Sequence, residues 1–198
     1  MNHRDLAGFV ILACLAIAGS GVAADKTPMS EEAAMQAHTA AVAPGAPHQH
    51  LATAAGTWDA VVKSWMDPAA PPMESRGTAE MTMILGGRYL RQAYKGEMMG
   101  MPYEGVGYTG YDNVQKKYVS TWFDNMGTGI MLSTGSDSGR PGVVTFTGSW
   151  WDPMTGKETT VEQVLTHVDA SHMTFEMFGN GPDGKKMKFM EIHYTKKS

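Results

Sequence analysis

From Thr57 onward the chain alternates apolar and polar residues in short runs separated by turn-forming residues. In the run 172–179, Met173, Phe175 and Met177 alternate with polar residues. A period of two places one set on one face of a strand, so this pattern is typical of strands with a single buried face. The same pattern predicts about ten strands, over residues 57–66, 73–84, 88–98, 103–111, 117–125, 129–137, 142–151, 157–168, 172–179 and 186–195.

The links between these strands are short and rich in Asp, Asn, Pro and Gly, as in DNVQK at 112–116 and DSGRPG at 137–142. Links of this kind join neighbouring strands into antiparallel hairpins. A meander of this length must protect both its edge strands and its apolar face, and closure into a barrel does both. We therefore predict an all-β fold, an antiparallel up-and-down meander closed into a barrel. A two-layer sandwich is the alternative, and the nearly continuous hairpin order favours closure.

Two short helices are predicted before the first strand. The stretch SEEAAMQAHTAAVA begins with Ser30, which suits a helix cap, and places two glutamates in the first turn. A second helix is predicted from Pro47 to Ala55, because proline suits the first helical position and Gly56 suits the exit. These features divide the chain into a leader at 1–24, a linker with a short helix at 25–46, and a barrel domain at 47–198.

The first 24 residues have the layout of a secretory signal. A short charged start precedes an apolar run from Leu6 to about Ala18, and the small residues Val22-Ala23-Ala24 suit a signal peptidase. The alternatives are a retained membrane anchor and a lipoprotein signal at Ile11-Leu12-Ala13-Cys14. Cleavage predicts a periplasmic or secreted protein with no further membrane span.

The amino-acid composition limits the chemistry that the cleaved protein can perform. Cys14 is the only cysteine, so cleavage leaves no thiol for disulfides, nucleophilic catalysis or zinc binding. The formal net charge is −4 and the pI is about 5.9, without the basic stripe that nucleic-acid binding requires. The sequence does not predict an oligomeric state.

A family resemblance is carried by the run AGTWDAVVKSWMDPAAPPMESRGTAEMTMILGGRYLRQAYKGEMMGMPYEGVGYTGYDNVQKKYVSTWFDNMGTGIM, continuing through WDPMTGKETTVEQV to FEMFGNGPDGKKMKFMEIHYT. These segments resemble the bacterial family called domain of unknown function 1579, over about residues 47–198. The resemblance implies a calycin-like, lipocalin-resembling barrel, often in exported proteins, with no assigned activity. Gly56-Thr57-Trp58 also resembles the G-x-W of lipocalins, in which the Trp plugs one barrel end below a short helix. The chain lacks the disulfides and the long C-terminal helix of classical lipocalins, so a broader calycin relative fits better.

The leading functional hypothesis is a pocket for a small hydrophobic or amphipathic molecule inside the barrel. Aromatic residues and methionines are abundant in the middle strands, and an apolar wall with a few polar groups is what a small-ligand pocket needs. The alternative is an interior filled by its own side chains. Glycines at 105, 107 and 110 favour a cavity, or else mark bends. The candidate ligand-binding residues are Trp122, Tyr108, Met99, Met101, Tyr118 and Phe175.

The stretch GEMMGMPYEG at 96–105 raises a second hypothesis, a periplasmic copper-handling protein. The thioethers of Met98, Met99 and Met101 are soft ligands for Cu(I), and a turn could bring them together with Met126. Because methionine is abundant in most strands, a barrel lining is the preferred interpretation and no metal site is assigned.

The histidines do not indicate a metal site more strongly than the methionines do. His48 and His50 lie two apart, which does not place them on one helix face, and no third ligand lies near them. His167 and His172 flank a predicted turn and can meet across a hairpin. Surface histidines are the simpler interpretation.

Motifs for catalysis are missing from the sequence. It contains no G-x-S-x-G, no phosphate-binding glycine loop and no H-E-x-x-H. We therefore predict no catalytic residues and no cofactor, and the alternative is a pair of acids for glycosidic chemistry, which Glu97, Glu104, Asp124 and Glu162 could form if they meet in space. The third hypothesis is a structural or partner-binding envelope protein without a ligand.

Overall fold

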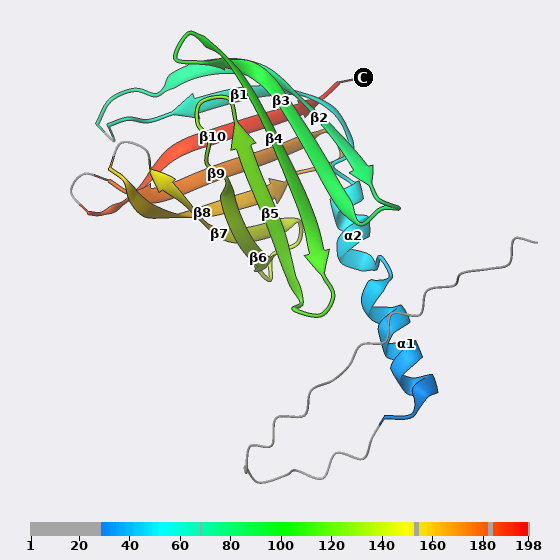
Figure 1. The fold of residues 1–198 in the computed structure, drawn as a ribbon. Coiled ribbons are helices and arrows are strands. Elements are labelled where there is room, and N and C mark those ends of the chain that lie inside the picture. The colour runs from blue at the N-terminus through cyan, green and yellow to red at the C-terminus, as the bar shows by residue number, and fades with distance from the viewer. Residues whose placement is uncertain (1–28, 68, 153–154, 182–183, 198) are drawn as a thin grey trace, which may run out of the picture.

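The computed structural model describes residues 29–67, 69–152, 155–181 and 184–197, and the predicted leader at 1–24 lies outside them. Two helices precede ten strands (Figure 1). Their bounds are α1 (Glu31–Val42), α2 (Ala46–Ala52), β1 (Gly56–Ser64), β2 (Met73–Ile84), β3 (Tyr89–Met98), β4 (Met101–Asp112), β5 (Lys117–Asp124), β6 (Met131–Asp137), β7 (Val143–Asp152), β8 (Lys157–His167), β9 (His172–Asn180) and β10 (Lys186–Lys196). Each predicted strand range coincides with one observed strand to within a few residues.

Every strand pairs antiparallel with its sequence neighbours, and β1 also pairs with β10, so the sheet closes into a barrel. Trp58 lies opposite Ala79 on β2 and opposite Lys196 on β10. Closure leaves no free sheet edge, which removes the unpaired backbone groups that an open meander would expose. The predicted all-β, up-and-down barrel is confirmed, and the sandwich alternative is wrong.

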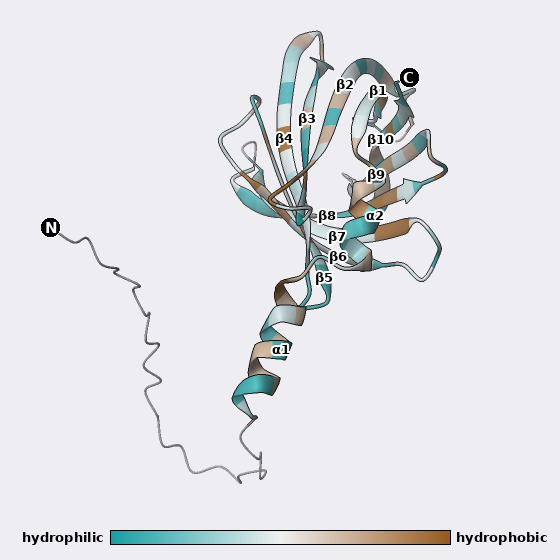
Figure 2. Ribbon diagram, turned by 90° about the vertical axis from the view of Figure 1, so that its right-hand side faces the viewer, coloured by the Kyte–Doolittle hydropathy of each residue, from teal (hydrophilic) through white to brown (hydrophobic). Residues whose placement is uncertain are grey.

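Alternation along the strands separates an inner from an outer face. On β1 the buried residues are Trp58, Ala60 and Val62, and on β9 they are Met173 and Met177. All of these side chains except Met177 belong to one continuous apolar cluster inside the barrel. Figure 2 shows the resulting mixture of hydrophobic and hydrophilic residues along each strand. The inner face is therefore where a site for an apolar molecule would have to lie.

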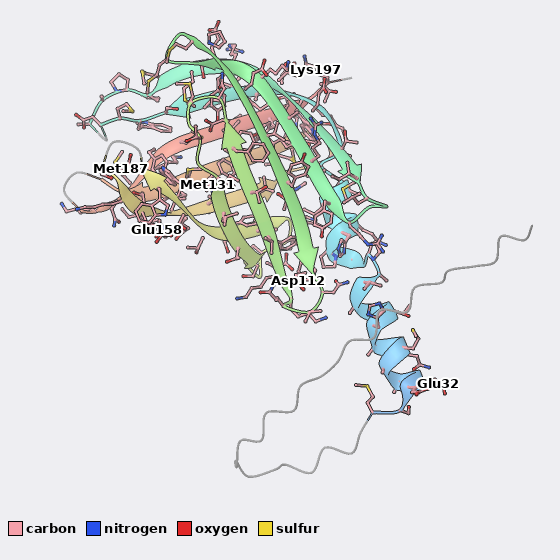
Figure 3. All side chains as sticks on the ribbon, in the orientation of Figure 1. Glu32, Asp112, Met131, Glu158, Met187 and Lys197 are labelled. Atoms are coloured by element: carbon pink, nitrogen blue, oxygen red, sulfur yellow. The ribbon has the colours of Figure 1, made fainter. Side chains whose placement is uncertain are left out.

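The helix α2 covers one end of the barrel, and the opposite end is called the far end below (Figure 1). Leu51 of α2 and Ala54 just after it are buried against the barrel. In Figure 3, Asp112 marks the α2 end and Met187 marks the far end.

The helix α1 stands away from the barrel and buries none of its residues (Figure 2). Its predicted cap is confirmed, because the Ser30 hydroxyl accepts a hydrogen bond from the Ala33 amide at 3.2 Å. Two barrel turns hold its other end: the Asn113 amide donates to the Ala41 and Ala43 carbonyls, and Arg88 donates to the Val42 carbonyl at 2.9 Å. These bonds satisfy carbonyls that a helix end leaves without partners. In the described part of the chain, no helix is both long enough and apolar enough to cross a bilayer.

Candidate functional site: the inner face of the barrel

Trp58 plugs the α2 end of the barrel. Its side chain is 1% exposed, and its indole Nε1 donates a hydrogen bond to the Ala54 carbonyl at 2.9 Å. The Lys196 ammonium lies 5.2 Å from the centre of one of its rings. Placing the indole under the helix satisfies its one polar group while burying its apolar surface. This arrangement agrees with the G-x-W resemblance.

On the inner face of β5, burial decreases from the α2 end towards the far end. On β5, Tyr118 is 1% exposed, whereas Ser120, Trp122 and Asp124 on the same face are only half-buried. Burial raises the pKa of Tyr118 to about 12, with the nearby Asp137 charge adding to the effect. The phenol is therefore neutral at pH 7.

Incomplete burial also occurs where β8, β9 and β10 pair, although Gln163 and Met177, the next inward residues on β8 and β9, are buried. Leu165 lies opposite Phe175, and Phe175 lies opposite Ile192. All three point inward and pack against the core cluster, yet all three stay half-buried. Because they lie on the inner face, their remaining exposure is towards the interior of the barrel. Side chains therefore do not fill this part of the interior at the density of a close-packed core.

Trp122 lies flat against the barrel wall over two glycines. A Cβ atom added at Gly105 would lie 2.2 Å from the Cζ2 atom of the indole, and one at Gly107 would lie 2.8 Å from its Cε3 atom. The glycines therefore make room for the ring, as small residues do where another group approaches the backbone closely. The sequence interpretation that these glycines open a cavity needs correction, because the indole occupies the space they leave. Gly110 is covered by Tyr89, whose ring carbon would lie 2.5 Å from an added Cβ.

A hydrogen-bonded group of Trp122, Tyr103 and Asp124 lies at the far end. The Tyr103 hydroxyl donates to a carboxylate oxygen of Asp124 at 2.9 Å. The indole Nε1 donates to the Tyr103 oxygen at 3.0 Å and to the same Asp124 oxygen at 3.2 Å. The other Asp124 oxygen accepts the Met126 amide at 2.9 Å. Burial raises the pKa of Tyr103 well above its ordinary value, so this phenol is a donor at any ordinary pH.

Further polar groups on the inner face have weak partners or none. Gln163 is 5% exposed, and its amide nitrogen donates to the Met131 sulfur at 3.3 Å, a weak acceptor. Among the described residues, the buried Tyr94 hydroxyl finds no hydrogen-bond partner, and burial raises its pKa. Thr109 and Ser120 bond to each other at 3.0 Å. Buried polar groups normally find full partners, so Gln163 and Tyr94 are exceptions that need a reason.

Of the six candidate ligand-binding residues, the structure places four on the inner face, one of them at its rim, and two elsewhere. Trp122, Tyr118 and Phe175 point inward. Tyr108 points outward, where its ring stacks on Phe123 with centroids 6.4 Å apart. Met101 continues the face of Tyr103 at the far-end rim and is 47% exposed, whereas Met99 lies in the β3–β4 turn and is 59% exposed. Tyr108 and Met99 therefore do not line the interior, and Met101 lies at its rim.

The sequence analysis missed Tyr103, Asp124 and Gln163 as inward-facing polar groups. Asp124 follows from alternation, because it extends the face of Tyr118 and Trp122 by one more position. Gln163 likewise falls between Val161 and Leu165 on the inner face of β8. Tyr103 depends on the pairing of β4 with β5, which brings it towards Asp124.

The histidines have structural roles at the α2 end. His48 is buried, and its Nδ1 accepts a hydrogen bond from the Gly45 amide at 3.0 Å, at the start of α2. The rings of His50 and His167 lie 4.7 Å apart. Burial, and secondarily the His50 charge, lowers the pKa of His167 to about 4. His172 does not meet His167, because it pairs with Asp169 at 3.0 Å. Within the described ranges, His, Cys, Asp and Glu side chains form no group of three or more that could hold a metal ion.

Two hollows lie outside the barrel. One, of about 410 Å³, lies over β5 to β8 and is lined mainly by Lys117, Glu162 and threonines. The other, of about 420 Å³, lies between α1 and the β4–β5 turn and is lined mostly by alanines. Neither is lined by the Trp122, Tyr103 and Asp124 group of the inner face.

The fold and the site define a closed, ten-stranded antiparallel barrel with a helix over one end and polar and aromatic side chains facing inward near the other. A family model described as a protein of unknown function, DUF1579, matches residues 43–196. The chain therefore belongs to this family.

Comparison with solved structures supports the fold alone. The crystal structure of Rv2717c from M. tuberculosis is similar, with 15% sequence identity, a TM-score of 0.59, and coverage of 78% of this chain and 100% of that one. A redesigned β-barrel matches with 14% identity and a TM-score of 0.41, over 75% of this chain and 96% of that one. A search of curated proteins gave no match.

Proposed function

We propose that the protein binds a small hydrophobic or amphipathic molecule inside the barrel. The observation that carries this proposal is the incomplete burial of inward-facing apolar side chains, above all Phe175 and its cross-strand partners Leu165 and Ile192. A barrel filled by its own side chains would bury such residues completely.

The polar groups support an amphipathic ligand in preference to a purely apolar one. Gln163 donates only to a thioether, and the Asp124 carboxylate faces the same side of the sheet as the half-buried Trp122. A few polar groups set into an apolar wall orient a ligand and supply its specificity.

The sharpest test adds volume inside the barrel. We expect Phe175→Trp to fold with little loss of stability, because free space receives the larger ring, and to lose binding of the neutral fluorescent probe N-phenyl-1-naphthylamine. The matched control is Phe123→Trp on the outer face, where Phe123 is 38% exposed. The control should bind the probe as the wild type does.

Two results would overturn this proposal. If the interior is already full, Phe175→Trp overpacks it and lowers the free energy of unfolding by about 1 to 3 kcal/mol. If the wild type binds no probe, and native mass spectrometry of protein from its own host shows only the bare chain, the barrel carries no ligand.

We also propose that the protein is exported after removal of residues 1–24. The support is the charged start, the short apolar run and the small residues at 22–24. Intact mass measurement of the protein from its host tests this, and the expected mature chain begins at Asp25. A mass that retains Met1 would contradict export by cleavage.

Copper handling is a second candidate function, favoured by one feature of the far end. Met99, Met101 and Met126 are exposed on two neighbouring loops, which a hydrogen bond from the Asn125 amide to the Pro102 carbonyl holds together at 3.1 Å. Exposed thioethers on adjoining loops suit Cu(I). Titration with Cu(I) against a competing chelator tests the idea, and unchanged affinity after replacement of Met98, Met99 and Met101 by Leu would end it.

A further inference from the structure

We propose that the bound molecule carries a positively charged amine or quaternary ammonium group, held between the Asp124 carboxylate and the inward face of Trp122. This inference rests on the proposed function, because it names the chemistry of a ligand that must first enter the barrel.

The Asp124 carboxylate is fixed in place and has no cationic partner among the described residues. Three donors orient it, namely the Tyr103 hydroxyl, the Trp122 indole and the Met126 amide, and none of them carries a charge. The donors satisfy part of the carboxylate's hydrogen-bonding capacity, since two oxygens offer about four lone-pair positions. The negative charge therefore remains uncompensated.

Two carboxylates on the outer face of the barrel, by contrast, have cationic partners. Glu104, on the outer face of β4, lies 3.4 Å from the Lys95 ammonium. Glu162, on the outer face of β8, lies 2.7 Å from the Lys186 ammonium. The inner neighbours of Asp124 are neutral, and they include Tyr103 and Trp122. A cation entering the barrel would meet Asp124 as an unpaired charge.

The indole of Trp122 offers its face to the interior. One face lies against the wall over Gly105 and Gly107, so the other face is turned towards the interior. A cation over an indole face is attracted by about 0.5 to 2 kcal/mol, more strongly where water is excluded. Asp124 lies two residues further along the same face of β5. A single cationic group can therefore contact the ring and the carboxylate together.

The same arrangement selects against anions and disfavours neutral heads. An anionic head group would face the Asp124 charge at short range without a compensating cation. A neutral head would leave the carboxylate partly desolvated and unpaired, which is unfavourable in a low-dielectric interior. The charge of the head group, and not only the length of the apolar tail, should therefore decide affinity.

The test compares three probes with the same octyl tail: octyltrimethylammonium, 1-octanol and octyl sulfate, each measured by calorimetry with the full mature chain. We expect the ammonium probe to bind at least tenfold more tightly than octanol, and octyl sulfate to bind most weakly. The preference should shrink with added salt, because the contact is partly electrostatic.

Variants then locate the preference. Asp124→Asn should remove the tenfold advantage of the ammonium probe while leaving octanol affinity within about twofold. The matched control is Glu80→Gln, which changes the net charge equally at an exposed position on the outer face of β2. This control should keep the advantage. If Asp124→Asn does not fold, the ranking of the three probes and its salt dependence in the wild type still decide the matter.

The outcomes separate this inference from the proposed function. Equal affinity for octanol and the ammonium probe, or an advantage that persists in Asp124→Asn, overturns the cationic head and leaves ligand binding intact. Failure of all three octyl probes and of the neutral naphthylamine overturns both.

Discussion

Replacement of Gly105 by alanine tests the position of Trp122, on which the candidate site depends. The new Cβ would lie 2.2 Å from Cζ2, 2.9 Å from Cε2 and 3.0 Å from Cη2 of the indole. Contacts this short cannot persist, and the backbone of β4 is fixed by pairing with β3 and β5. The indole must therefore lift from the wall into the interior.

Two effects determine how much Gly105→Ala lowers the free energy of unfolding. Forcing an extra methyl into occupied space typically costs about 1 to 3 kcal/mol. Moving the ring also weakens the Nε1 bonds to Tyr103 and Asp124, and hydrogen bonds contribute about 0.5 to 1.5 kcal/mol each, or more to a charged group. Free interior space relieves part of the strain. We expect Gly105→Ala to lower the free energy of unfolding by about 2 to 4 kcal/mol.

Urea unfolding measures this loss, and near-ultraviolet circular dichroism reports the altered indole environment. The matched control is Gly129→Ala, where an added Cβ meets nothing within 4 Å. The control should leave stability unchanged or raise it slightly, because alanine restricts the unfolded chain. If Gly105→Ala is as stable as Gly129→Ala, with the same aromatic spectrum, the indole does not rest on the wall and the argument for its free face fails.

Three further predictions concern the α2 end. His167 has a folded-state pKa of about 4 against an ordinary value of 6.5, so its contribution to stability is present above pH 6.5 and is lost as the pH falls towards 4. The loss is roughly 1 to 2 kcal/mol after allowance for solvent screening. Urea unfolding between these pH values should show that the free energy of unfolding depends less on pH in His167→Gln, and an unchanged dependence would refute the assignment. Trp58→Phe removes the bond to the buried Ala54 carbonyl, and urea unfolding should show a loss of about 1 to 3 kcal/mol, whereas wild-type stability would contradict the plug. Asn113→Ala should speed amide exchange near the end of α1 without changing barrel stability, and equal exchange rates would show that its two bonds do not hold the helix.

The barrel could be predicted from sequence because its main signals are local. Alternation assigns each strand, and turn residues set the short hairpin links, so the order of pairing follows with few alternatives. Even the cap of α1 at Ser30 is readable from a few neighbouring residues. The pairing of β1 with β10 joins segments that are far apart in the sequence. It could still be predicted, because it is the pairing that removes both free edges of the meander.

The site was harder to predict because it depends on neighbours across strands. Tyr108 and Trp122 are both aromatic residues of the middle strands, yet one faces outward and the other inward. Alternation groups residues on one strand into two faces, but it does not say which face is inside when both carry aromatic residues. That choice is fixed by register, which places Gly107 opposite Trp122 and Val106 opposite Phe123.

Glycines on the inner face of this barrel indicate neither an empty interior nor a filled one. The hydroxyl end of Tyr94 occupies the space at Gly77 and Gly96, and the Trp122 ring occupies that at Gly105, so each of these three glycines is covered by an aromatic side chain, whereas Gly148 is covered by the Ser133 hydroxyl. A ring that lies flat over a glycine occupies space next to the backbone that the Cβ of any other residue would fill. It buries one face and keeps the other turned inward, so the barrel gains apolar contact without using up the middle of its interior. Binding capacity in such a barrel therefore depends on where glycines lie opposite aromatic residues, and the count of either residue alone does not reveal it.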